Sequence, residues 1–171
     1  NTPFRLFKNW AHEGGISSPC IVRWPALVDA GGITAEPAYI NDITATCLEA
    51  AGVDYPDELD GRPLLPIEGE SFLPLLQGRP WSRHKPITVE HEGNRCIRKG
   101  DWKLVGETGG PWELYNIEED RTELDNLVEG NTGKAEELQT EYDAWAERCG
   151  VLPCPVDPQE VGSSSRLIQR W

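Results

Sequence analysis

Short apolar runs in the second half of the chain, each bounded by glycine, proline or polar residues, predict an antiparallel β-sheet. The predicted strands cover residues 87–90, 95–99, 102–105 and 112–116. Gly100-Asp101 stands between the second and third runs and fits a tight hairpin loop. The second half of the chain is therefore predicted to contain a small antiparallel sheet.

Residues 131–149 change to the spacing of an amphipathic helix, with Asn131 as a possible N-terminal cap and Gly150 where a C-terminal glycine belongs. The residues on its apolar side are Leu138, Tyr142, Trp145 and Cys149. We expect this helix to cover one face of the sheet.

The first half of the chain predicts a different layer. Residues 16–24 form a β-branched and aromatic run that starts after a glycine pair and stops at Pro25, which is typical of a buried central strand. Residues 41–51 predict an amphipathic helix that ends before Gly52. The proline-rich residues 53–86 predict an irregular connector.

The pattern changes near residues 81–86, which predicts a domain boundary there. We assign residues 1–83 to an α/β unit, residues 84–155 to the antiparallel sheet with its helix, and residues 156–171 to a tail. The expected fold class is α/β, turning to α+β in the C-terminal part.

Charge narrows the functions that this chain can have. Its 171 residues carry a formal net charge of −13, which argues against binding nucleic acid over a broad surface. Residues 1–25 are locally basic, with Arg5, Lys8 and Arg23 against Glu13. No apolar run approaches the roughly 18–20 residues of a membrane span, so we expect no membrane segment.

The five cysteines are odd in number and contain no C-x-x-C pair, so they predict neither a zinc knuckle nor a redox motif. We expect Cys20 and Cys47 to be buried free thiols. Cys149 and Cys154 could form a local disulfide in an oxidising compartment, and the compartment stays open.

The candidate chemistry lies in the basic N-terminal region. Lys8 precedes His12 and the pair Gly14-Gly15, and a compact ammonium beside such a turn suits a sulfate or phosphate oxygen. The same sequence pattern also fits the alternative that Lys8 is an ordinary solvent-facing lysine. His12 fits a general acid, a general base or a packed histidine. His91, flanked by two glutamates, fits either a substrate-orienting residue or a surface ion pair.

Other catalytic motifs are absent from the sequence: it has no G-x-S-x-G elbow, P-loop or dinucleotide fingerprint. The acidic stretch of residues 54–61 lacks the spacing of a calcium-binding EF-hand and predicts a turn.

Four blocks in this order resemble the C-terminal part of the sulfatase family, close to bacterial arylsulfatases. The blocks cover residues 1–25, 41–56, 90–105 and 112–127. The most specific pieces are K-x-x-x-H-E-G-G and W-K-L followed by L-Y-N-I-x-x-D-x-x-E-x-x-N-L.

The resemblance implies a large α/β domain joined to a small antiparallel sheet with a packed helix, of which this chain holds the end of the first and all of the second. Lys8 matches the family lysine that contacts the sulfate oxygens and the leaving-group oxygen. His12 faces the same region in the resemblance, and His91 and Asn94 lie where the small domain approaches the substrate.

The nucleophile of the family is absent here. Family members oxidise the Cys or Ser of C/S-x-P-x-R to formylglycine, and no cysteine here has Pro two and Arg four positions later. The resemblance places formylglycine and the Ca²⁺ ligands in segments upstream, so no metal ligand is assigned in this chain. A second departure is Arg121 where the family often has proline.

These observations lead to three hypotheses about the function of the chain. The chain is the C-terminal part of an arylsulfatase-like hydrolase of sulfate esters, inactive alone and completed by an N-terminal part. Alternatively, it is a free-standing interaction module, or the tail of a phosphate or phosphonate ester hydrolase. The exposed strand edges of a lone fragment favour self-association.

The sequence begins at Asn1 and has no Met, so we expect a preceding segment. A typical bacterial sulfatase would be periplasmic or secreted, and a cytoplasmic location stays open.

Overall fold

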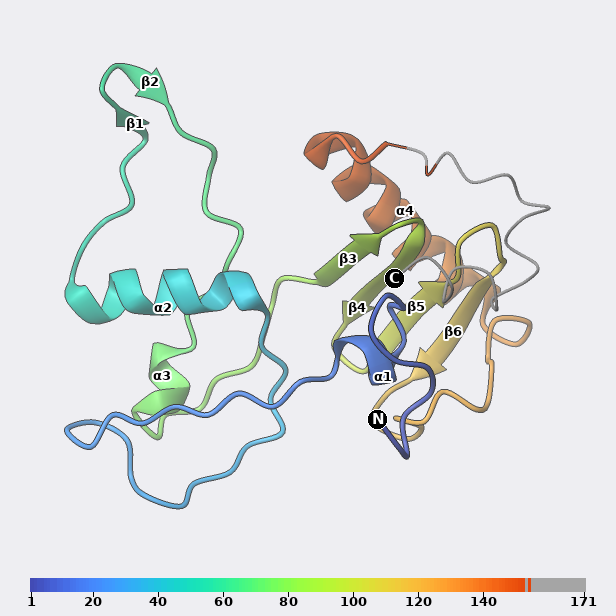
Figure 1. The fold of residues 1–171 in the computed structure, drawn as a ribbon, viewed down its shortest axis with the longest axis horizontal. Helices are drawn as coiled ribbons and strands as arrows, with labels where there is room; N and C mark the ends of the chain where they lie inside the picture. The colour runs from blue at the N-terminus through green and yellow to red at the C-terminus, as the bar shows by residue number, and fades with distance from the viewer. Residues whose placement is uncertain (153, 155–171) are drawn as a thin grey trace. The chain divides into compact units, whose positions relative to one another are not determined.

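The computed structural model describes residues 1–152 and residue 154, in two compact units (Figure 1). The first unit joins Asn1–Pro19 to the described residues from Pro86 onward, and the second is Cys20–Lys85. Residues 1–19 therefore pack with the sheet, whereas the sequence analysis placed them with the rest of residues 1–83. The predicted tail, residues 156–171, lies outside the described residues.

The first unit is built on a four-stranded antiparallel sheet in the order β3-β4-β5-β6, and the four strands predicted from the sequence are confirmed. The strands are β3 Ile87–His91, β4 Asn94–Lys99, β5 Trp102–Gly106 and β6 Trp112–Asn116. Ile97 pairs with Leu104, which pairs with Leu114. Alternate residues of each strand point to opposite faces, so the sheet has two faces of different composition.

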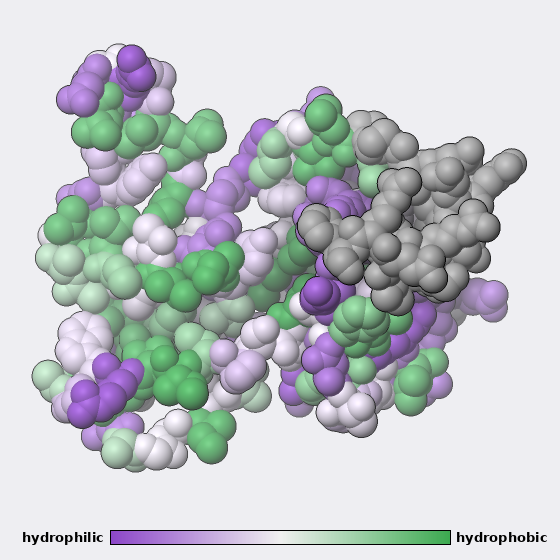
Figure 2. Space-filling model, viewed as in Figure 1, coloured by the Kyte–Doolittle hydropathy of each residue, from purple (hydrophilic) through white to green (hydrophobic). Residues whose placement is uncertain are grey.

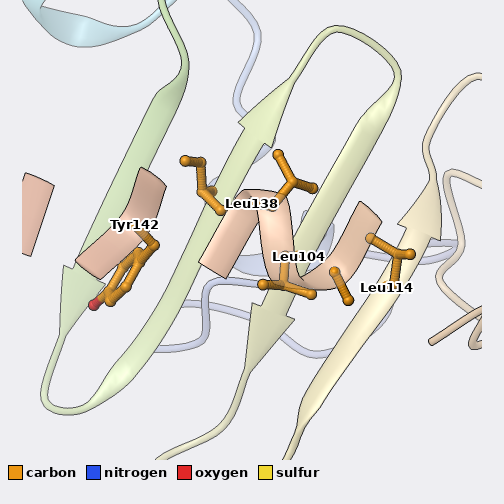
Figure 3. Close-up of a cluster of buried hydrophobic side chains, with 6 residues drawn as sticks. Leu104, Leu114, Leu138 and Tyr142 are labelled. Carbon is orange, nitrogen blue, oxygen red and sulfur yellow. The ribbon is translucent and has the colours of Figure 1, made fainter. Parts of the chain in front are cut away.

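Helix α4 (Thr132–Cys149) packs on one face of this sheet, as predicted. Leu138 and Tyr142 of the helix lie in one buried cluster with Leu104 and Leu114 of the strands (Figure 3). Trp145 packs against this cluster, whereas Cys149 is exposed at the last turn. Gly150 ends the helix in the left-handed conformation expected of a C-terminal glycine.

The opposite face of the sheet is covered by the N-terminal segment and its single-turn helix α1 (Glu13–Ile16). A second apolar cluster lies there. It consists of Ala11, Cys96, Val105, Tyr115 and Ile117, with Ile16 and Val89 packed against it. Burial raises the pKa of the Cys96 thiol to about 11, so this cysteine is a small apolar core residue.

The second unit contains the predicted amphipathic helix, α2 (Ile40–Ala51), and more regular structure than the predicted connector. Strands β1 (Glu58–Leu59) and β2 (Arg62–Pro63) form a short hairpin, and α3 (Leu73–Leu76) follows. Asp42 is buried in this unit and accepts hydrogen bonds from the backbone amides of Tyr39 and Glu70. The Asp42 carboxylate also pairs with Arg83.

Two predictions for the first half of the chain are wrong. The run at residues 16–24 is not a buried strand: Ile16 ends α1, and Ile21 is 92% exposed. A β-strand needs a neighbouring strand to pair its backbone amides, and none of the described strands pairs with this run. Cys20 and Cys47 are exposed free thiols because this run and the outer side of α2 are uncovered.

Candidate functional site

Lys8 lies on an exposed loop whose backbone is strained on both sides of it. Leu6 and Asn9 have φ angles of 62° and 83°, the left-handed region that costs a residue other than glycine about 1–3 kcal/mol. The Lys8 side chain is exposed, and it makes no hydrogen bond or ion pair with any residue that the structure describes. The loop thus presents an ammonium group without a partner among the described residues to solvent.

The pair Gly14-Gly15 closes this loop against its own backbone. A Cβ atom on Gly14 would lie 2.2 Å from the carbonyl oxygen of Leu6, and one on Gly15 would lie 1.9 Å from that of Trp10. The backbone amide of Gly14 donates to the carbonyl of Arg5 across 3.0 Å. The close backbone approach predicted for this pair is therefore confirmed, and only glycine fits there.

Arg5 ties the beginning of the loop to the edge strand β6. Its Nη1 donates to Glu113 Oε2 at 2.8 Å and to the Tyr115 hydroxyl at 2.9 Å. Burial alone would raise the pKa of Glu113, but the hydrogen bonds from Arg5, Tyr115 and His12 lower it. Glu113 is thus an ionised acceptor for groups on both sides of Lys8.

Glu13 ties the end of the loop to the sheet through a buried ionic triad. Lys103 Nζ lies 3.0 Å from Glu13 Oε1 and 2.8 Å from Glu123 Oε1, and none of the three side chains is more than 4% exposed. Glu123 Oε2 accepts the Glu13 backbone amide at 2.7 Å. Burial alone would lower the pKa of Lys103, but the negative charges around it, including both carboxylates, raise it.

His12 is fully buried beneath the loop, with Nε2 3.3 Å from Glu113 Oε2. Burial lowers its pKa, and the nearby charge of Glu123 opposes this only in part. His12 is thus neutral near pH 7 and belongs to the contact between loop and sheet. Its Nδ1 has no hydrogen-bond partner among the residues that the structure describes.

His91 and Asn94 flank the β3–β4 turn, and they differ in exposure. His91 is exposed, whereas Asn94 is buried and its Oδ1 accepts the Thr108 amide at 3.3 Å. Within the described part of the chain, no hydrogen bond or ion pair connects either residue to Lys8. Their predicted role in substrate binding stays a prediction.

Sequence reasoning missed the residues that hold the loop: Arg5, Glu13, Lys103, Glu113 and Glu123. A signal for them exists, because Lys103 and Glu113 are single charges inside otherwise apolar strands, at alternate positions that face the N-terminal segment.

The described residues contain no group of three or more His, Cys, Asp or Glu side chains placed to hold a metal ion. The described residues therefore do not fit a calcium site. In the same part of the chain, no helix has the length and apolar character needed to cross a membrane.

The sequence matches the family described as "N-sulphoglucosamine sulphohydrolase, C-terminal" over residues 4–145. It is 32% identical to an uncharacterized sulfatase of Schizosaccharomyces pombe, across 91% of this chain and 29% of that protein. It is 29% identical to an N-acetylglucosamine-6-O-sulfatase of Bacteroides thetaiotaomicron, across 75% of this chain and 24% of that protein. The chain thus spans less than a third of these relatives.

Solved structures share the fold. A crystal structure of Ps i-CgsB matches 85% of this chain and 32% of its own, with a TM-score of 0.67 and 24% identity. The structure of BT4656 in complex with its substrate D-glucosamine-2-N,6-O-disulfate matches 80% of this chain and 30% of its own, with a TM-score of 0.56 and 24% identity.

Proposed function

The chain belongs to the sulfatase family, as its C-terminal domain, and from this premise we propose that Lys8 binds the sulfate group of an ester that the whole enzyme hydrolyses. The observation that carries the proposal is the exposed, unpaired ammonium of Lys8 in a neighbourhood where Arg5 and Lys103 are both ion-paired. A cation kept free of protein partners is available for an anionic ligand.

Sulfate ester cleavage places additional negative charge on the sulfate and leaving-group oxygens in the transition state. A lysine ammonium held near those oxygens stabilises this charge without having to reorganise during the reaction. The strained loop and its two ionic anchors support this role, because they fix the backbone from which the ammonium extends. The remaining chemistry, including the nucleophile, comes from outside this chain under the proposal.

We further propose that the second unit is a docking surface for the rest of the enzyme. Figure 2 shows apolar residues gathered over α2 and the segments beside it. Within this unit Ile21, Ile33 and Leu65 are 85–99% exposed. Large exposed apolar patches mark interaction sites, and the relatives are more than three times as long as the matched segment. The run 16–24 would find its strand partners there.

The test compares the full-length sulfatase that contains this chain with its Lys8→Met variant, using p-nitrophenyl sulfate as substrate. We expect kcat/KM to fall by about 10²–10³, the usual effect of removing one transition-state donor. Lys134→Ala removes a partly exposed lysine that pairs with Glu137 on α4, and should leave kcat/KM unchanged.

The isolated chain should not hydrolyse p-nitrophenyl sulfate at all. Turnover by the isolated chain, or an unchanged rate in the Lys8→Met enzyme, would contradict the proposal. Hydrolysis of p-nitrophenyl phosphate by the full-length enzyme in place of the sulfate would assign the chain to the phosphate ester hydrolases instead.

A further inference from the structure

The ionic contacts of the N-terminal segment bracket Lys8 in sequence. Arg5 lies three residues before Lys8 and pairs with Glu113, and Glu13 lies five residues after it and pairs with Lys103. Glu113 and Lys103 stand on the adjacent strands β6 and β5, on the face opposite α4. Both ends of the loop are therefore fastened to one rigid surface.

The loop needs this fastening because its own conformation is unfavourable. Leu6 and Asn9 hold positive φ angles on either side of Lys8, and such residues persist only where the surroundings over-determine them. Lys8 has no partner of its own among the described residues and cannot hold the loop in place. The position of its ammonium thus depends on the two anchors.

The two anchors differ in what else they support. Lys103 and Glu13 are buried in the unit, so changing either one also removes a piece of its core. The Arg5 side chain is 31% exposed. Without it, Glu113 still accepts a hydrogen bond from the Tyr115 hydroxyl at 2.8 Å and lies 3.3 Å from His12 Nε2. Arg5 is the anchor that can be removed while the sheet keeps its polar groups satisfied.

We propose that Arg5 is a positioning residue for Lys8: its bridge to Glu113 holds the strained loop so that the ammonium meets the sulfate in one place. This inference rests on the proposed role of Lys8. Arg5 itself contacts Glu113, Tyr115, the Glu107 carboxylate and the Glu123 carbonyl, so its effect on catalysis passes through the position of the loop.

The test is a double-mutant cycle in the full-length sulfatase, with p-nitrophenyl sulfate as substrate and the variants Arg5→Gln, Lys8→Met and both together. We expect Arg5→Gln alone to lower kcat/KM at least tenfold, because a displacement of about 1 Å in a positioned group costs up to about 10²-fold. In the Lys8→Met background the same change should have no further effect. A purely structural role for Arg5 would lower the rate equally in both backgrounds and would overturn the inference.

Arg95→Gln is the matched control. Arg95 is a half-buried arginine on β4 that stacks on Trp112 at 4.3 Å and donates to the carbonyls of Glu107 and Gly110. Its side chain lies on the α4 face of the sheet, and at Glu107, whose carboxylate accepts a hydrogen bond from Trp10 of the loop, it holds only the backbone carbonyl. Its removal should cost stability but keep kcat/KM within about twofold, and a loss equal to that of Arg5→Gln would count against positioning.

Arg5→Lys keeps the test decisive if Arg5→Gln does not fold. Lysine retains the charge but cannot reach both carboxylate oxygens, as Nη1 and Nη2 do at 2.8 and 3.5 Å. It should lower kcat/KM in the Lys8 enzyme only. If Lys8→Met leaves the rate unchanged, the proposed function fails; if Lys8→Met lowers it and the Arg5 variants do not, only the positioning role fails.

Discussion

Replacing Lys103 with methionine tests the buried ionic triad directly. Methionine has a similar length and volume but no charge, so the substitution leaves no large cavity and removes the cation between Glu13 and Glu123. Both carboxylates are at most 4% exposed, and Arg121 still pairs with Glu13 at 3.4 Å. Among the described residues, the Glu123 carboxylate then keeps only its hydrogen bond from the Glu13 amide.

Leaving a buried charge without its partner costs about 3–5 kcal/mol, and the whole stability of a domain is about 5–15 kcal/mol. We therefore expect Lys103→Met to lower the free energy of unfolding of the first unit by about 3–5 kcal/mol at pH 7. The assay is urea unfolding followed by the NMR signals of the β4 and β5 amides, which report on this unit alone.

Two further measurements test whether the loss comes from unpaired buried charge. The loss should shrink as the pH falls from 7 toward 4, because without Lys103 the buried carboxylates take up protons on folding. The variant that also carries Glu13→Gln and Glu123→Gln should recover most of the loss, since it buries no unpaired charge. A loss below about 1 kcal/mol at pH 7, or one independent of pH, would show that the triad is not the buried unit that its geometry indicates.

Two other predictions concern the face of the sheet that the N-terminal segment covers. The pKa of His12 is lower in the folded chain than its ordinary value of about 6.5, so stability should fall as the pH drops below about 6.5, because the unfolded chain takes up a proton first. Stability should fall further below about 4.5, where the unfolded chain begins to protonate Glu13 and Glu113 while the folded chain, in which their pKa values are lowered, resists. Urea unfolding at a series of pH values measures this, and His12→Gln should remove the upper part of the decline. Gly15→Ala should lower the free energy of unfolding by at least about 2 kcal/mol, because its Cβ would lie 1.9 Å from a carbonyl oxygen. The control is Gly133→Ala in α4, whose Cβ meets nothing within 4 Å and which should be neutral or stabilising. Thermal unfolding of the two variants measures the difference.

The elements predicted correctly are those whose signals are local. The strand at residues 102–105 alternates between two buried faces and is joined to its neighbour by a two-residue turn, so the sequence around it contains both the pattern and the pairing. Helix α4 carries its own apolar stripe and its own terminal glycine.

The run at residues 16–24 was predicted wrongly because strand formation depends on a partner that local sequence does not specify. Its β-branched and aromatic residues are suited to a strand, but in the described structure they have no neighbour to pair with. The packing of residues 1–19 on the sheet was missed for a similar reason. Arg5 and Glu113 are 108 positions apart, and nothing near either residue identifies the other.

The candidate site also contains residues with a local sequence signal and residues without one. Lys8 and the glycine pair could be found from the sequence, since their residue types and spacing carry the chemistry. The residues that hold them could not, because a lysine such as Lys103 inside a strand is informative only once its buried position is known.

The buried charges on this face are better explained by the position that they impose on the loop than by any gain in folding stability. Replacing a buried ion pair with apolar residues of similar volume is often neutral or stabilising, so Lys103, Glu13 and Glu123 add little net stability over a plain hydrophobic contact. An apolar contact would tolerate sliding of the loop over the sheet, whereas each ion pair has one favourable distance and direction. The 2.7 Å hydrogen bond from the Glu13 amide to Glu123 fixes the backbone at the glycine turn, and the Arg5 bridge fixes it at the other end. A network of this kind is what an exposed lysine requires if its ammonium must meet one set of oxygens.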